Sequence, residues 1–119
     1  MQKPASATTP RAALVTGGVK RIGHAIALAL AQAGYAVAIH ARASEAEARA
    51  VCADIAARGG RAHPVLADLA DPRAASGLVA AAATAVGPLT LLVNNAALFE
   101  ADDIGAFDCD CFDRMCAVN

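Results

Sequence analysis

The chain has 119 residues, enough for one domain, and 57% of them are hydrophobic, with alanine supplying about half of these. The net charge is −1, aromatic residues make up only 3%, and no basic patch with interleaved aromatics occurs, which argues against a nucleic-acid partner. Because no run of 18 apolar residues is free of a charge or a glycine, the sequence predicts no membrane-spanning helix.

The first ten residues are polar and contain proline, without the apolar segment of a signal peptide, so we expect a flexible lead-in over 1–10 and a domain over 11–119. Without a secretion signal, the four cysteines are expected to be reduced thiols in a cytoplasmic protein. The Cys109-x-Cys111 pair lacks a C-x-x-C knuckle. No metal site is predicted.

Extended and helical patterns alternate along the chain, as they do in a parallel sheet with crossover helices. The expected strands cover residues 12–16, 35–40, 61–66 and 89–93, and the expected helices cover 22–33, 44–58, 72–86 and 107–119. Pro64 falls in the third strand, and since proline cannot donate to a strand ladder, this strand is expected at an edge. A strand order of 3-2-1-4 meets that requirement.

The first two helices have recognisable faces and ends. The first carries Ile22, Ile26 and Leu30 on one face and is expected to stop at Gly34. In the second, Ser44 and the glutamate three residues later are expected to form a capping box. The buried stripe of the second helix is expected at residues 51 and 55.

A glycine-rich turn, residues 16–23, joins the first strand to the first helix. Gly17 and Gly18 permit a sharp turn, and Gly23 lets the helix begin close to the strand. The unpaired N–H groups of the first helical turn and the helix dipole favour a phosphate there, although a tight turn without a ligand has the same pattern. In the expected sheet this turn meets Asn94-Asn95 at the carboxyl ends of strands 1 and 4, where ligands bind in open α/β sheets.

The turn reads T-G-x-x-x-R-x-G and resembles the T-G-x-x-x-G-x-G of the short-chain dehydrogenase/reductases, with Arg21 in place of the middle glycine. Within that superfamily it is most similar to the pteridine and dihydromonapterin reductases. Residues 94–97 resemble the N-N-A-G motif, and 112–119 resemble a helix ending in V-N. The resemblance implies an α/β Rossmann-type, doubly wound parallel sheet, of which this chain is expected to be the N-terminal part.

The resemblance also implies a nicotinamide cofactor. The position where NAD-binding relatives carry an acid is Ala41, and Arg42 follows it, which favours the 2′-phosphate of NADP. Asp68 would accept a hydrogen bond from the adenine amino group, or it could cap its own loop. The residues expected at the cofactor are Thr16, Gly17, Lys20, Arg21, Ile22, Gly23, His40, Arg42, Ser44, Asp68, Leu69, Asn94, Asn95 and Ala96.

Asn119 matches the asparagine of the family's Asn-Ser-Tyr-Lys proton relay, while Tyr35 is the only tyrosine and lacks a lysine four residues later. We therefore expect hydride transfer to a pterin C=N or a carbonyl in the parent enzyme, and no turnover by this chain alone. The alternatives are a 3-oxoacyl-thioester or other ketone reductase, and a non-catalytic nucleotide-binding module. The expected partners are a small-molecule substrate and, for the parent enzyme, further copies of itself.

Overall fold

The computed structural model describes residues 10–100, 104–106 and 108–119. The lead-in expected over 1–10 therefore lies, apart from Pro10, outside the described residues. The same is true of Phe107, where the last helix is expected to begin; that helix is observed from Cys109 onward.

Four parallel strands form one sheet, and they lie in the order β3-β2-β1-β4, which confirms the expected order. The strands are β1 (Ala12–Val15), β2 (Ala36–Ala41), β3 (Arg61–Leu66) and β4 (Leu91–Val93). Pro64 lies in the edge strand β3 opposite Ile39. At the other edge, β4 pairs with β1 from Ala13↔Leu91 to Val15↔Val93, and the side chain of Leu92 is 47% exposed.

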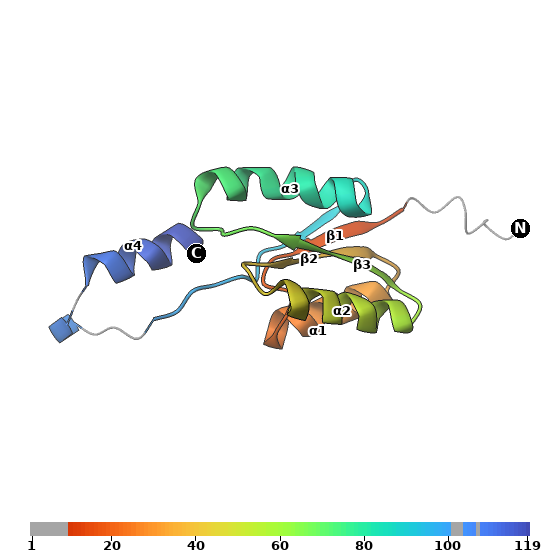
Figure 1. The fold of residues 1–119 in the computed structure, drawn as a ribbon, viewed down its shortest axis with the longest axis horizontal. Helices are drawn as coiled ribbons and strands as arrows, with labels where there is room; N and C mark the ends of the chain where they lie inside the picture. The colour runs from red at the N-terminus through yellow and green to blue at the C-terminus, as the bar shows by residue number, and fades with distance from the viewer. Residues whose placement is uncertain (1–9, 101–103, 107) are drawn as a thin grey trace, which may run out of the picture.

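Helices cover both faces of this sheet. The long helices are α1 (Arg21–Gln32), α2 (Glu45–Ala57), α3 (Pro72–Val86) and α4 (Cys109–Val118), with a short 3-10 turn, η2 (Ile104–Ala106), before the last. Figure 1 shows α1 and α2 on one face, α3 on the other, and α4 beyond the carboxyl ends of the strands. The arrangement is the expected doubly wound α/β fold. No helix of the described residues is long and apolar enough to cross a membrane.

The core is divided by the sheet into two apolar clusters, because successive residues of a strand point to opposite faces. Toward α3, Leu14 packs with Ala38, Val65, Leu78 and Ala82. Toward α1 and α2 the cluster consists of Val15, Ala27, Val37, Ile39, Val51, Cys52 and Ile55. All residues of β1 and β2 are buried, as expected for parallel strands covered on both faces.

The buried stripe of α1 differs from the expected one. Its fully buried residues are Gly23 and Ala27, whereas Ile26 and Leu30 are half-buried and Ile22 is 70% exposed. The reason is the close approach of this helix to the sheet, which leaves room only for the smallest side chains along the contact. Large apolar residues therefore flank the contact instead of forming it.

Helix ends follow local sequence rules at three places and depart from them at one. Gly34 (φ 97°) and Gly59 (φ 84°) end α1 and α2 in the left-handed conformation, and Asp71 caps α3 by accepting from the Arg73 N–H. The capping box expected at α2 is wrong: Ser44 is the N-cap residue but its side chain makes no capping hydrogen bond. Glu47 instead forms an ion pair outside its own helix, described below.

Candidate functional site

The ends of β1 and β4 are joined by side-chain hydrogen bonds from two polar residues. The Thr16 hydroxyl accepts from the N–H groups of Asn95 (3.0 Å) and Ala96 (2.9 Å) and donates to the Val93 carbonyl (3.3 Å). In return, the Asn95 amide donates to the carbonyls of Thr16 and Gly17, both at 3.1 Å. Two segments about 80 residues apart in sequence are thus held in one fixed position.

Glycine is required where the turn touches its neighbours. A Cβ atom on Gly23 would lie 2.1 Å from the Gly17 carbonyl oxygen and 2.4 Å from the Asn95 amide nitrogen. A Cβ atom on Gly17, which has φ 63°, would lie 3.0 Å from the Ala96 Cα. The start of α1 therefore sits directly against the ends of β1 and β4, at a distance only glycine allows.

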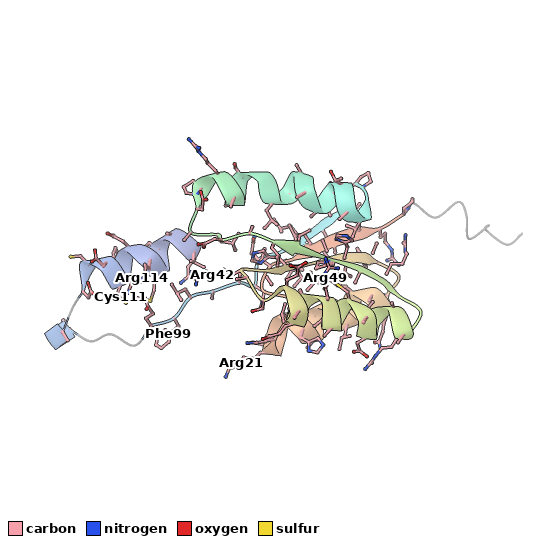
Figure 2. The ribbon with its side chains drawn as sticks, viewed as in Figure 1. Arg21, Arg42, Arg49, Phe99, Cys111 and Arg114 are labelled. Atoms are coloured by element: carbon pink, nitrogen blue, oxygen red, sulfur yellow. The ribbon has the colours of Figure 1, made fainter. Side chains whose placement is uncertain are left out.

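Arg21 also has a positive φ, 55°, and no other described non-glycine residue does. This left-handed conformation costs an L-residue roughly 1–2 kcal/mol, which explains why glycine is common at this position in the family that the sequence resembles. Figure 2 shows the Arg21 side chain extending away from the body of the molecule. The guanidinium is therefore accessible to a ligand outside the turn.

The first turn of α1 presents the positive end of the helix dipole beside the carboxyl ends of β1 and β4. Its N-cap residue, Lys20, makes no side-chain capping bond, and no acidic residue lies in the turn. The amide N–H groups and the positive end of the helix dipole are thus not offset by a carboxylate of the helix itself. The Lys20 ammonium lies 3.3 Å from a carboxylate oxygen of Glu47, on α2.

His40 is buried at the end of β2, and both its ring nitrogens bind backbone atoms. Nδ1 accepts from the Gly17 N–H at 2.9 Å, and Nε2 donates to the Ala67 carbonyl at 2.8 Å. Burial lowers the pKa of this imidazole, and the weaker opposing effect is the bond to Ala67. A neutral His40 therefore connects the glycine turn to the loop after β3, and neither ring nitrogen remains to contact a phosphate.

Arg42 and Asp68 face each other beside the glycine turn, with 3.8 Å between the guanidinium Nε and a carboxylate oxygen. The other Asp68 oxygen accepts from the Ala70 N–H at 3.0 Å, so this carboxylate does cap its own loop while one oxygen faces the arginine. A cavity of about 120 Å³ opens between them, lined by Gly17, His40, Arg42, Ala67, Asp68, Leu69, Ala96 and Val118. Six of these eight residues are expected cofactor residues.

Three other expected residues do not line this cavity. Ser44 is exposed at the start of α2, and Ile22 is exposed at the start of α1. Asn94 is exposed at the end of β4 and lines a separate, open hollow of about 500 Å³ with Asn119. The expected residues that line a hollow therefore fall into two groups near the carboxyl ends of the strands: one lines the cavity beside Arg42, and the other, with Asn94 and Asn119, lines the open hollow.

The end of α4 is fastened to the loop after β4 by a pair of hydrogen bonds. The Asn119 amide donates to the Leu98 carbonyl at 3.0 Å and its oxygen accepts from the Leu98 N–H at 2.8 Å. Arg114 and Glu100 form an ion pair at 3.0 Å between the same segments, and this contact lowers the pKa of the Glu100 carboxyl. Sequence reasoning missed these contacts, because no local pattern relates Leu98 to Asn119.

The described residues were compared with the side-chain groups that hold metal ions in proteins. In 10–100, 104–106 and 108–119, no group of three or more histidine, cysteine or acidic side chains is placed to hold a metal ion. None of the four cysteines forms a disulfide in the described part of the chain; Cys52 and Cys111 are buried, and Cys109 and Cys116 are exposed. Burial raises the pKa of the Cys52 thiol, which packs in the core below α2.

The fold, the glycine turn and the hydrogen bonds of Asn95 to that turn are the features to compare with known families. A family model described as short chain dehydrogenase matches residues 11–119. The chain belongs to this family. Among curated relatives, an uncharacterized oxidoreductase of Methylorubrum extorquens is 47% identical over 90 residues, which are 76% of this chain and 36% of the relative. The 3-oxoacyl-[acyl-carrier-protein] reductase FabG of Staphylococcus aureus is 38% identical over 88 residues, 74% of this chain and 36% of the relative.

Solved structures of family members superpose closely on this chain. FolM alternative dihydrofolate reductase 1 of Brucella canis, complexed with NADP, has a TM-score of 0.84 at 46% identity, covering 91% of this chain and 43% of that one. A short chain dehydrogenase of Burkholderia cenocepacia, also in complex with NADP, has a TM-score of 0.85 at 44% identity, covering 91% and 44%. The chain therefore spans less than half the length of these relatives.

Proposed function

We propose that this chain is the cofactor-binding portion of an NADP(H)-dependent short-chain reductase. The observation that carries the proposal is the meeting of the glycine turn with Asn95 and Ala96 at the strand ends, next to a cavity bordered by Arg42. The site suits a dinucleotide because backbone N–H groups, a helix N-terminus and a small apolar-walled cavity adjoin one another. The bound NADP of two structural neighbours supports the same assignment.

The preference for a 2′-phosphate follows from the end of β2. Ala41 is buried and offers no carboxylate to a ribose diol, whereas the Arg42 side chain is 77% exposed and able to reach a phosphate. Lys20, Arg21 and the hydroxyl of Ser44 complete the proposed contacts. Asp68 and Leu69 are proposed to contact the adenine through the cavity that they line.

In this proposal NADPH, when bound, supplies a hydride to the substrate. Gly17 and Gly23 keep the turn close enough for backbone N–H groups to bind the pyrophosphate. Asn119 lines the open hollow and holds the Leu98 backbone of the loop that follows β4. The proton donor is proposed to come from outside these 119 residues, since Tyr35 has no lysine four positions later.

Two substrate classes compete, a pterin and a ketone. The similarity to an alternative dihydrofolate reductase at 46% identity, together with the Lys20-Arg21 pair, favours a pterin C=N as hydride acceptor. The similarity to a 3-oxoacyl-[acyl-carrier-protein] reductase at 38% identity favours a ketone. We place the pterin first, because the Lys20-Arg21 pair of the glycine turn adds to the similarity to a solved structure.

Cofactor binding to the chain itself tests the proposal. In calorimetric titrations we expect NADPH to bind more tightly than NADH, and Arg42→Ala to weaken NADPH by about 1.5 kcal/mol, the lower end for a bond to a charged group, because the side chain is exposed. Arg58→Ala is the matched control, since Arg58 is an exposed arginine that pairs with Asp54 at the far end of α2. Equal affinities for NADPH and NADH would contradict the proposal.

Ligand-observed magnetic resonance separates the substrate classes. With the chain saturated by NADPH, a dihydropterin and a 3-oxoacyl thioester are added separately, and transfer of saturation from protein to ligand is measured. Transfer to the dihydropterin alone supports the pterin assignment. Transfer to the thioester alone replaces it with the ketone reductase.

A further inference from the structure

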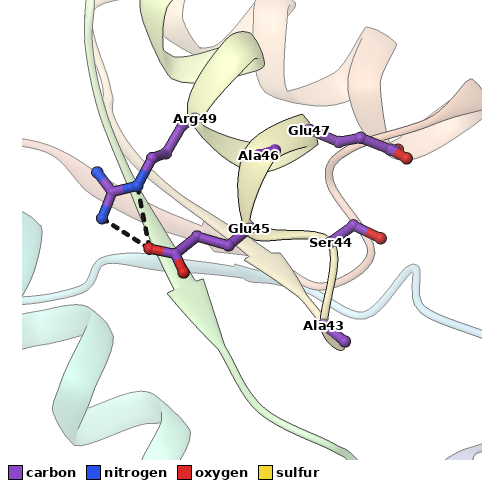
Figure 3. Close-up of a pocket in the computed structure, with 6 residues that line it drawn as sticks. All are labelled: Ala43, Ser44, Glu45, Ala46, Glu47 and Arg49. Carbon is purple, nitrogen blue, oxygen red and sulfur yellow. Dashed lines mark hydrogen bonds and ion pairs between the residues drawn. The ribbon is translucent and has the colours of Figure 1, made fainter.

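The ion pair between Lys20 and Glu47 crosses from the glycine turn to the first turn of α2. The two charged atoms are 3.3 Å apart, and the side chains are 69% and 49% exposed. Figure 3 shows Ser44 and Glu47 pointing to one side of the start of α2, while Glu45 turns the opposite way toward Arg49. Glu47 thus shares its side of the helix with Ser44, one of the groups proposed to bind the 2′-phosphate.

Two of the three cations proposed for that phosphate are already paired with carboxylates. Lys20 is paired with Glu47, and Arg42 faces Asp68 at 3.8 Å. The two carboxylates differ in what else holds them: Asp68 is fixed by the Ala70 N–H, while Glu47 projects from a helix surface and is about half exposed. An exposed ion pair of this kind adds little to folding and opens easily.

We propose that Glu47 is a specificity-determining residue that competes with the ribose 2′-phosphate for Lys20 and thereby limits the preference for NADP over NAD. The inference rests on the proposed function, because it assumes that Lys20 contacts the phosphate. A 2′-phosphate must displace the Glu47 carboxylate before it can pair with the Lys20 ammonium. A ribose bearing a 2′-hydroxyl makes no such demand and leaves the pair intact.

Glu45 provides a matched control on the same helical turn. Its carboxylate accepts from both Nε and a terminal nitrogen of Arg49, at 3.0 and 2.8 Å, so its charge is offset within the helix. Glu45→Gln and Glu47→Gln remove the same charge two positions apart. Only the second frees Lys20, so a general change in net charge is separated from the release of one ammonium.

The test compares two small nucleotides, 2′,5′-ADP and 5′-AMP, which differ in the 2′-phosphate. Dissociation constants are measured by calorimetry for the 119-residue chain at low salt. Glu47→Gln is expected to tighten 2′,5′-ADP about three- to tenfold and to change 5′-AMP by less than twofold, and Glu45→Gln to change both by less than twofold. In 1 M salt, where the Debye length is about 3 Å, the gain of Glu47→Gln is expected to shrink below twofold.

A double variant tests whether the effect of Glu47 acts through Lys20. In a chain that already carries Lys20→Ala, adding Glu47→Gln is expected to change the dissociation constant of 2′,5′-ADP by less than twofold. If the full gain persists there, or if Glu47→Gln leaves the 2′,5′-ADP affinity of the parent chain unchanged, the role of Glu47 is overturned while the NADP proposal stands. If the unsubstituted chain fails to bind 2′,5′-ADP more tightly than 5′-AMP, the NADP proposal fails and this inference fails with it.

Discussion

The layered body, residues 11–93, and the described residues of the arm that follows it, 94–100, 104–106 and 108–119, bury their apolar side chains to very different extents. In the body, β1 and β2 are buried at every position, and Leu14, Val15, Val37 and Ile39 have no measurable exposure. In α4, the helix of the arm, Cys111 is the one buried residue, and Phe112 is 51% exposed. Phe99, before α4, is 85% exposed; Figure 2 shows it on the connecting loop.

The comparison shows that different interactions hold the two regions. The body is held by packing on both faces of a sheet. The arm helix begins with a local cap, in which the Asp108 carboxylate accepts from the Asp110 N–H, and it is attached to the preceding loop by the Asn119–Leu98 bonds and the Arg114–Glu100 pair. Since exposed polar contacts are weak, we expect the part of the arm beyond Ala96 to contribute little to the stability of the body.

The largest expected effect is a loss of free energy of unfolding, measured for one apolar residue from each region. Ile55→Ala removes a side chain that is 1% exposed beneath α2 and is expected to lower the free energy of unfolding by about 2–5 kcal/mol. Phe112→Ala, in the arm, is expected to lower it by less than about 1 kcal/mol, because half of that ring is already in water. Urea unfolding followed by circular dichroism measures both; similar losses would show that the arm is part of the cooperative core.

The next effect concerns glycines that differ only in their surroundings. Gly23→Ala would place a methyl group 2.1 Å from the Gly17 oxygen, and we expect a loss of about 3 kcal/mol, since the strand ends must move apart. Gly77→Ala, at a site in α3 where a Cβ meets nothing within 4 Å, is expected to add about 0.5–1 kcal/mol. In thermal unfolding, Gly23→Ala should lower the midpoint temperature and Gly77→Ala should raise it. An unchanged midpoint for Gly23→Ala would contradict the close approach of α1 to the strand ends.

The smallest effect is a pH dependence that belongs to the body. The pKa of His40 is lowered from 6.5 by burial, so the unfolded chain binds a proton before the folded chain does. The stabilisation by neutral His40 is therefore complete above about pH 6.5 and is lost as the pH falls toward the folded pKa. His40→Asn should flatten the stability profile below about pH 6.5 in urea unfolding repeated across pH; an unaltered profile in His40→Asn would assign the dependence to another group.

Sequence reasoning predicted the sheet because its signals are local. Pro64 alone indicated which strand lies at an edge, and the strand order is confirmed. The bounds of β3 and of α3 agree with the expected ones. β4 begins at Leu91 instead of residue 89, although the Thr90 N–H does donate to the Ala12 carbonyl just outside the assigned strand.

The errors arose where a distant partner decides the outcome. The capping box of α2 looked complete from its own residues, but Glu47 pairs with Lys20, 27 positions earlier. The contact face of α1 was assigned to its largest apolar residues, yet closeness to the sheet selects Gly23 and Ala27. His40 lines the cavity, but its bonds to two backbone groups from different loops could not be foreseen from its own strand. Each of these contacts joins residues of different elements, so the residue spacing within one element does not predict it.

The position of β1 in the middle of the sheet has a consequence for the order in which the chain is made. Its first neighbour, β2, is complete at residue 41, but its second neighbour, β4, begins only at residue 91. At translation rates of roughly 5–20 residues per second, the intervening 50 residues take about 3–10 s. During that time a nascent chain carries an open apolar strand edge at Ala13, Leu14 and Val15, to which chaperones and neighbouring nascent chains have access until β4 emerges and closes it.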